Sequence, residues 1–68
     1  MSLHKYMLDF SALATDERAS LFERIDGVTY NGLALNPETQ TGTFLVDESF
    51  NVDSLKIPIC CHLTRVHQ

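Results

Sequence analysis

The chain has 68 residues and a net charge of −4 at neutral pH, with 44% hydrophobic and 21% charged residues. This length predicts one domain, residues 1–68, with a thin core, and the composition is typical of a folded chain. The five basic residues are scattered along the sequence, so no basic stripe is present for direct binding to nucleic-acid phosphates.

Targeting and membrane signals are not evident in the sequence. No apolar run approaches the ~20 residues of a membrane-spanning helix. The first ten residues lack the basic start and apolar stretch of a signal peptide. Two adjacent cysteines do not make the disulfide framework of a small secreted domain. We therefore expect a cytoplasmic protein without a membrane partner.

The first predicted element is a strand over residues 4–10. Large apolar residues alternate with Lys5, Met7 and Asp9 in this stretch, and a period of two is that of a strand with one buried face. The side chains that we expect to face the core are Tyr6, Leu8 and Phe10.

A helix is predicted over Thr15–Asp26. Thr15 is a suitable N-cap, and the acidic residues after it favour the positive end of the helix dipole. Gly27 is placed where a helix often ends in a left-handed conformation. The apolar stripe consists of Leu21, Phe22 and Ile25, which must pack against a sheet because so short a helix is not stable alone.

Two hairpin interpretations compete in the middle of the chain. Asn31-Gly32 is a strong two-residue turn signal, whereas residues 36–42 form a longer loop with turn residues at both ends. We favour the second loop, which joins strands over residues 28–35 and 43–47. Gly32 then marks a bulge in the first strand. If both turns form, this region is a three-stranded meander.

The C-terminal third predicts a loop followed by a strand. Residues 48–56 are interpreted as a loop anchored by Phe50, Val52 and Leu55, although Asp53 suits the cap of a single helical turn. Residues 57–66 alternate as a strand. Pro58 has no amide hydrogen, so the beginning of this strand belongs at a sheet edge or outside the sheet.

These elements predict an α+β fold in which one helix packs on a mainly antiparallel sheet of about four strands, in the order β-α-β-β-β. The connection through the helix is long enough for a right-handed crossover between two parallel strands. With the last strand beside the first, the arrangement would resemble a truncated ferredoxin-like sandwich that lacks its second helix. Such a resemblance in fold carries no function.

The strongest chemical feature is Cys60-Cys61-His62, with His4 at the other end of the chain. Thiolate and imidazole groups suit zinc or copper. However, neighbouring residues of a strand point to opposite faces, so Cys60 and Cys61 cannot both reach one metal. Cys60 and His62 lie about 7 Å apart on a regular strand, which is too far for a nucleophile–base pair. We expect no cofactor, and an enzymatic function is not favoured.

One helix covers only one face of a sheet, and the second face is expected to be half apolar. A face of this kind is a candidate interface. The leading hypothesis is a small protein-interaction module, either a homodimer or a subunit, adaptor or inhibitor of another protein. The residues expected at this interface are Met7, Leu45, Cys60, His62, Thr64 and Val66.

Two alternatives remain open. The first is a small ligand-binding or metal-binding protein, or a minimal enzyme, centred on Cys60 and His62, with His4 as a further metal ligand. The second is an acidic antagonist of a nucleic-acid-binding protein, which requires Asp47, Glu48 and Asp53 to line one face.

Overall fold

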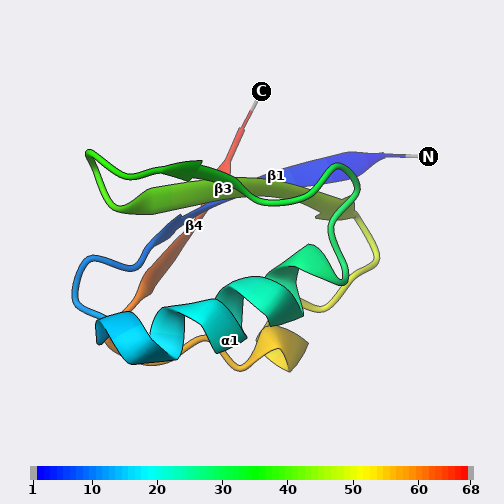
Figure 1. The fold of residues 1–68 in the computed structure, drawn as a ribbon. Coiled ribbons are helices and arrows are strands. Elements are labelled where there is room, and N and C mark those ends of the chain that lie inside the picture. Colours follow the sequence, from blue (N-terminus) through cyan, green and yellow to red (C-terminus); the bar gives the residue numbers. More distant parts are fainter. Residues whose placement is uncertain (1, 68) are drawn as a thin grey trace.

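The computed structural model describes residues 2–67, and the order of its elements confirms the predicted β-α-β-β-β chain (Figure 1). The strands are β1 (Leu3–Asp9), β2 (Ala34–Asn36), β3 (Thr41–Asp47) and β4 (His62–Val66). The helix α1 spans Thr15–Asp26, and a short 3₁₀ helix, η1, spans Val52–Leu55. The fold class is therefore α+β.

The four strands form one sheet in the order β2-β3-β1-β4, and each neighbouring pair is antiparallel. Because β1 and β2 are both antiparallel to β3, they run in the same direction with β3 between them. β4 lies beside β1, which is the pairing on which the resemblance to a ferredoxin-like sandwich depends. This connectivity is a split β-α-β arrangement. The predicted truncated ferredoxin-like sandwich fits it, with η1 in the place of the second helix.

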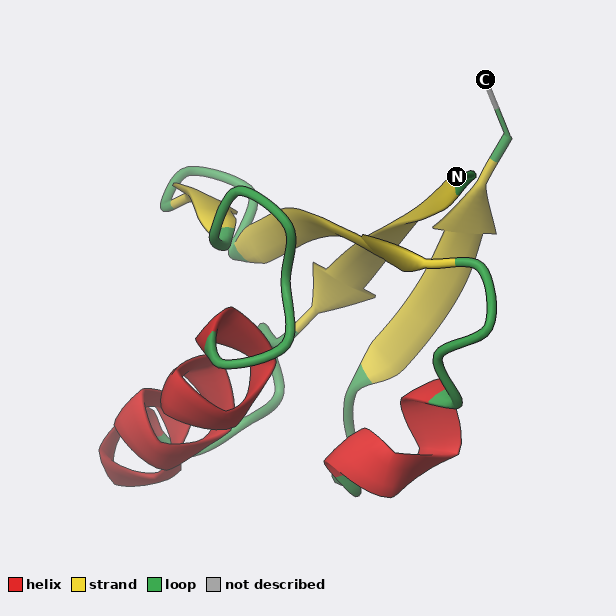
Figure 2. Cartoon of the chain, turned by 90° about the vertical axis from the view of Figure 1, so that its right-hand side faces the viewer, coloured by secondary structure: helices red, strands yellow, loops and turns green. Residues whose placement is uncertain are grey.

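Both helices lie on the same side of the sheet (Figure 2), and the core fills the space between them and the strands. Tyr6 is half-buried and stacks on Phe44, with 5.8 Å between the ring centroids. The predicted inward direction of Tyr6, Leu8 and Phe10 is confirmed. The buried hydrophobic side chains are Leu8, Phe10, Leu13, Leu21, Ile25, Phe44, Val46, Leu55 and Cys61.

The predicted bounds of α1 and the position of Gly27 at its end are correct, but the predicted N-cap and the left-handed conformation of Gly27 are wrong. Ala14 occupies the N-cap position without a side-chain hydrogen bond, so Thr15 is the first helical residue. Gly27 has φ of −68° and needs no left-handed conformation. The helix closes instead with a tighter turn, because the amide of Val28 donates to the carbonyl of Ile25 at 3.0 Å.

Arg18 joins the first half of α1 to the neighbouring loops. Its Nε donates to the carbonyl of Leu13 at 3.1 Å, and its Nη2 donates to Oε1 of Gln40 at 2.9 Å. The guanidinium carbon lies 5.0 Å from the centroid of the Phe10 ring. These contacts fix the start of the helix against the end of β1 and the β2–β3 hairpin.

The favoured loop does form the β2–β3 hairpin, but the first of its strands is much shorter than predicted. Residues 28–33 lie outside the sheet, although the Tyr30 amide donates to the carbonyl of Leu45 at 2.8 Å. Gly32 has a φ of 84° within this irregular segment. It is therefore neither the turn of a hairpin nor a bulge between paired strands.

Gln40, with φ of 55°, is the left-handed residue of the hairpin. Gly42 was expected to offer this conformation, but it is paired with Leu35 and buried. A Cβ atom at Gly42 would lie 3.0 Å from Cδ1 of Leu33. Gly42 is therefore needed for the close approach of these leucine side chains.

Both central strands end in the same three-residue sequence, Asp-x-Ser. Oδ1 of Asp9 accepts from the amide and hydroxyl of Ser11, at 3.0 and 2.7 Å. Oδ1 of Asp47 accepts from the same groups of Ser49, at 2.9 and 2.5 Å. These side chains mimic a backbone turn, so each aspartate ends its own strand. Because β1 and β3 are antiparallel, the two turns lie at opposite ends of the sheet.

The last strand begins five residues later than predicted. The carbonyl of Pro58 accepts from the amide of Cys61 at 2.9 Å, and this turn contains Ile59 and Cys60. Pro58 has no amide hydrogen to donate to a neighbouring strand, and its carbonyl oxygen accepts its hydrogen bond within the turn. Ile59 was expected to face the core, but its side chain is 101% exposed.

The burial pattern predicts that two chemically identical substitutions differ in their effect on stability. Leu8→Ala should lower the free energy of unfolding by about 2–5 kcal/mol, because Leu8 is fully buried. Leu35→Ala should cost less than half as much, because Leu35 is 49% exposed. Urea unfolding followed by circular dichroism measures both. Equal losses would contradict the assignment of Leu8 to the core.

Candidate functional site

Within residues 2–67, neither α1 nor η1 covers the second face of the sheet, and we call this face the outer face. Successive strand residues alternate between faces, so the strand register assigns its members. They are Leu3, Lys5, Met7, Asp9, Ala34, Asn36, Thr41, Thr43, Leu45, Asp47, His62, Thr64 and Val66.

Five of the six residues expected at the interface lie on this face, namely Met7, Leu45, His62, Thr64 and Val66. Cys60 does not, because it lies in the turn before β4. Met7 on the central strand is 37% exposed, although it has strands on both sides. The outer face therefore presents an apolar side chain at the middle of the sheet.

The register arranges the outer face in rows that run across the strands. Leu45, Lys5 and Val66 form a row with one positive charge. The next row has no charge and consists of Ala34, Thr43, Met7 and Thr64. The third row contains a carboxylate and an imidazole and consists of Asn36, Thr41, Asp9 and His62.

The carboxylates of the outer face are held in their ionised form. Hydrogen bonds from Ser11 keep the pKa of Asp9 below its ordinary value, and the nearby His62 lowers it further. Hydrogen bonds from Ser49 lower the pKa of Asp47 in the same way. At neutral pH, the outer face therefore carries fixed negative charge at Asp9 and Asp47.

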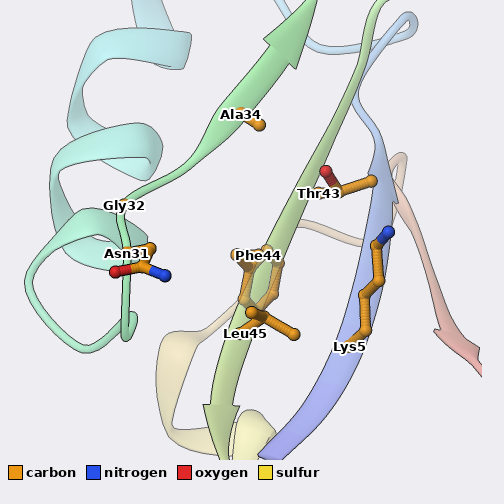
Figure 3. A pocket seen from close by; sticks show the side chains of 7 residues that line it. All are labelled: Lys5, Asn31, Gly32, Ala34, Thr43, Phe44 and Leu45. Atoms are coloured by element: carbon orange, nitrogen blue, oxygen red, sulfur yellow. The ribbon is translucent and has the colours of Figure 1, made fainter. Parts of the chain in front are cut away.

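A hollow of about 220 Å³ opens at one side of the outer face (Figure 3). It forms because β2 begins only at Ala34, which leaves β3 uncovered near Leu45. Figure 3 shows Thr43 and Leu45 of β3 beside Lys5 of β1. The lining residues are Lys5, Asn31, Gly32, Ala34, Thr43, Phe44 and Leu45. The hollow is wide enough to receive a side chain of another molecule.

The structure separates the candidate metal ligands. His4 is paired with Val46, whereas His62 is paired with Asp9, five residues further along β1. This spacing places the two histidines roughly 17 Å apart along the strand, so they cannot share one ion. Within residues 2–67, no group of three or more His, Cys, Asp or Glu side chains is close enough to hold a metal.

The two cysteines have different surroundings. Cys60 is exposed, whereas Cys61 is buried in the core. Burial, reinforced by the neighbouring Cys60 thiol, raises the pKa of Cys61 to about 11. A thiol that remains protonated at neutral pH is a poor nucleophile and a poor metal ligand. Cys61 therefore serves as a small apolar residue of the core.

The acidic residues considered for an antagonist do not share a surface. Asp47 ends β3 on the outer face, and Glu48 lies in the turn that follows. Asp53 belongs to η1, on the opposite side of the sheet (Figure 2). The sheet therefore separates Asp53 from Asp47, and the three carboxylates do not line one face as an acidic antagonist requires.

No helix within residues 2–67 is both long and apolar enough to cross a membrane. No protein-family model matches the chain, and neither curated proteins nor solved structures gave a significant match. The case for the outer face consequently rests on geometry and chemistry.

The different surroundings of the cysteines predict unequal reactivity. Iodoacetamide at pH 8 should alkylate Cys60 in the folded protein and leave Cys61 unmodified, as measured by mass spectrometry on Cys60→Ser and Cys61→Ser variants. The folded-state pKa of Cys61 lies above the ordinary value of 9.0. The protonated Cys61 thiol therefore stabilises the folded protein below pH 9, and this stabilisation is lost as the pH rises towards 11. Equal alkylation of both thiols in the folded protein would contradict the burial of Cys61.

Proposed function

We propose that this protein is a small protein–protein interaction module that binds its partner through the outer face of its sheet. The observation that carries the proposal is the uncovered centre of this face. Met7 on the central strand is flanked by Thr43 and Thr64, and Leu45 and Val66 flank Lys5 in the next row. A partially apolar sheet face without a covering layer is unusual for a protein that functions alone.

The distribution of residue types on the outer face supports this function. The row of Met7 is uncharged, Lys5 carries the one positive charge of the neighbouring row, and the ionised Asp9 and Asp47 lie at the strand ends. Protein interfaces commonly have this arrangement, with charges depleted at the core and a polar rim. Methionine is adaptable in shape, so Met7 suits the middle of such a surface.

The size of the outer face sets the class of interaction. The strands have seven, seven, five and three residues, and at ~3.4 Å rise and ~4.8 Å spacing they give a projected area of at most roughly 400 Å². Two partners would therefore bury about 800 Å² in projection, and somewhat more after side-chain relief. This lies at the low end of specific interfaces. We infer a reversible interaction rather than a permanent one.

Site-specific photo-crosslinking tests this proposal. A photoreactive amino acid is placed at Met7 or Thr64 on the outer face, and a matched control is placed at Ser20, which is exposed on α1. The protein is produced in the cells that naturally make it and is then irradiated. The Met7 and Thr64 positions should yield adducts of a few discrete masses, identified by mass spectrometry, that the Ser20 position does not yield.

Two results would argue against the outer face as the binding surface. One is the absence of any protein adduct at Met7 and Thr64. The other is the appearance of the same adducts, in similar yield, at Ser20. A product with twice the mass of the chain would identify a second copy as the partner, and a different mass would identify another protein.

A further inference from the structure

Two charges of the outer face, Lys5 and Asp9, are placed symmetrically about one row of residues, whereas Asp47 lies beyond the row of Lys5, at the end of β3. The uncharged row that contains Met7 lies between the row of Lys5 and the row of Asp9. Lys5 and Asp9 are each two residues from Met7 on the same strand, or about 7 Å along it. The central strand thus carries opposite charges at equal distances from an uncharged residue.

This pattern fits the requirement of a two-fold symmetric interface. In such an interface, residue i of one copy contacts residue j of the other, and j contacts i in return. Residues on the symmetry axis meet their own copies, so they must be uncharged. An axis that crosses the strands at Met7 places the uncharged row on itself. The same axis brings each Lys5 over Asp9 of the second copy.

We propose that the protein forms a homodimer in which two outer faces pack together about a two-fold axis crossing the strands at Met7, with Lys5 of each copy against Asp9 of the other. This inference rests on the proposed function, since it names the partner of the same surface. The two sheets would stack face to face about 10 Å apart, as in a β-sandwich.

The alternative two-fold axis, parallel to the strands along β1, is excluded by charge. It would place Lys5 over Lys5 and Asp9 over Asp9 of the second copy. Like charges facing each other across an interface oppose binding. Asp9 is ionised at neutral pH, and two hydrogen bonds from Ser11 stabilise its carboxylate. Only the axis across the strands pairs opposite charges.

The area of the outer face indicates the class of this dimer. About 800 Å² of total projected area is below the standard size of a stable interface, and interfaces of this size belong to weak, transient complexes. Its Lys5–Asp9 contacts lie near solvent, and salt should weaken them. The protein should therefore change from monomer to dimer over an accessible range of concentration.

Charge exchange with sedimentation equilibrium tests the arrangement. Lys5→Asp and Asp9→Lys should each weaken the dimer by more than about tenfold, because each creates two like-charge contacts. Mixing the two variants should restore association, since every contact in the mixed dimer then joins opposite charges. The double variant Lys5→Asp/Asp9→Lys should also dimerise, because its charges are exchanged but still complementary. Lys56→Asp, which makes the same charge change outside the outer face, is the matched control and should leave the dimer unchanged.

Different results would contradict the proposed axis, the homodimer or the proposed function. A monomeric double variant would overturn the axis across the strands, because that axis still pairs opposite charges in the double variant. A wild-type protein that is monomeric at millimolar concentration would overturn the homodimer. The proposed function would survive that result if photo-crosslinking at Met7 still captured a different protein, and it would fail if no adduct formed.

A variant that misfolds would also fail to dimerise, so the folding of each variant has to be checked. Asp9→Lys removes the acceptor of the Ser11 hydrogen bonds, so circular dichroism must show a folded protein.

Independently, Met7→Cys in a Cys60→Ser background places a thiol on the proposed axis. A short bismaleimide reagent should join two copies at Met7→Cys far more efficiently than at Ser20→Cys in the same background. Equal yields at the two positions would contradict the proposed axis.

Discussion

The structure depends on the packing of both helices, α1 and η1, against one face of the sheet. Leu8 of the central strand, Leu21 and Ile25 of α1, and Leu55 of η1 are all buried in this single layer. Both crossover connections, from β1 to β2 and from β3 to β4, lie on this side (Figures 1 and 2). Neither connection covers the outer face, so residues 2–67 provide no second layer over it.

Periodicity was sufficient to predict the well-packed elements. The alternation around Leu8 identified β1 and its buried side, and the stripe of Leu21 and Ile25 identified α1 with the observed bounds. These features are local, because each follows from residues a few positions apart. The β2–β3 hairpin was also predictable, since turn residues mark its loop. The order of elements and the α+β class followed from these three assignments.

The wrong predictions concern residues whose backbone conformation depends on hydrogen bonds, which cannot be predicted from the pattern of apolar side chains. Pro58 accepts from Cys61 and forms a turn, although the surrounding apolar residues alternate as in a strand. Gln40 takes the left-handed conformation of the hairpin, whereas Gly42 is paired in β3 and packs against Leu33. Asn51, rather than Asp53, caps η1. Each choice depends on neighbours brought together by the fold.

The candidate site was predictable in its residues but not in its arrangement. Alternation placed Met7, Leu45, Thr64 and Val66 on the face away from the helix, and the structure places them there. The rows of charge that suggest a symmetric dimer depend on register between strands that are distant in sequence. Met7, for example, lies between Thr43 and Thr64. Such register is fixed by the complete sheet and is not visible in any single segment.

The central claim is that the outer face is covered by another molecule when the protein functions. Radical footprinting tests it most directly, by comparing side-chain oxidation in the protein's own cells with oxidation of the purified protein at nanomolar concentration. The account predicts that Met7 and Leu45 are oxidised less in cells, while Tyr30, which is exposed outside the sheet, is oxidised equally in both. Equal oxidation of Met7 and Leu45 in the two samples would contradict the account.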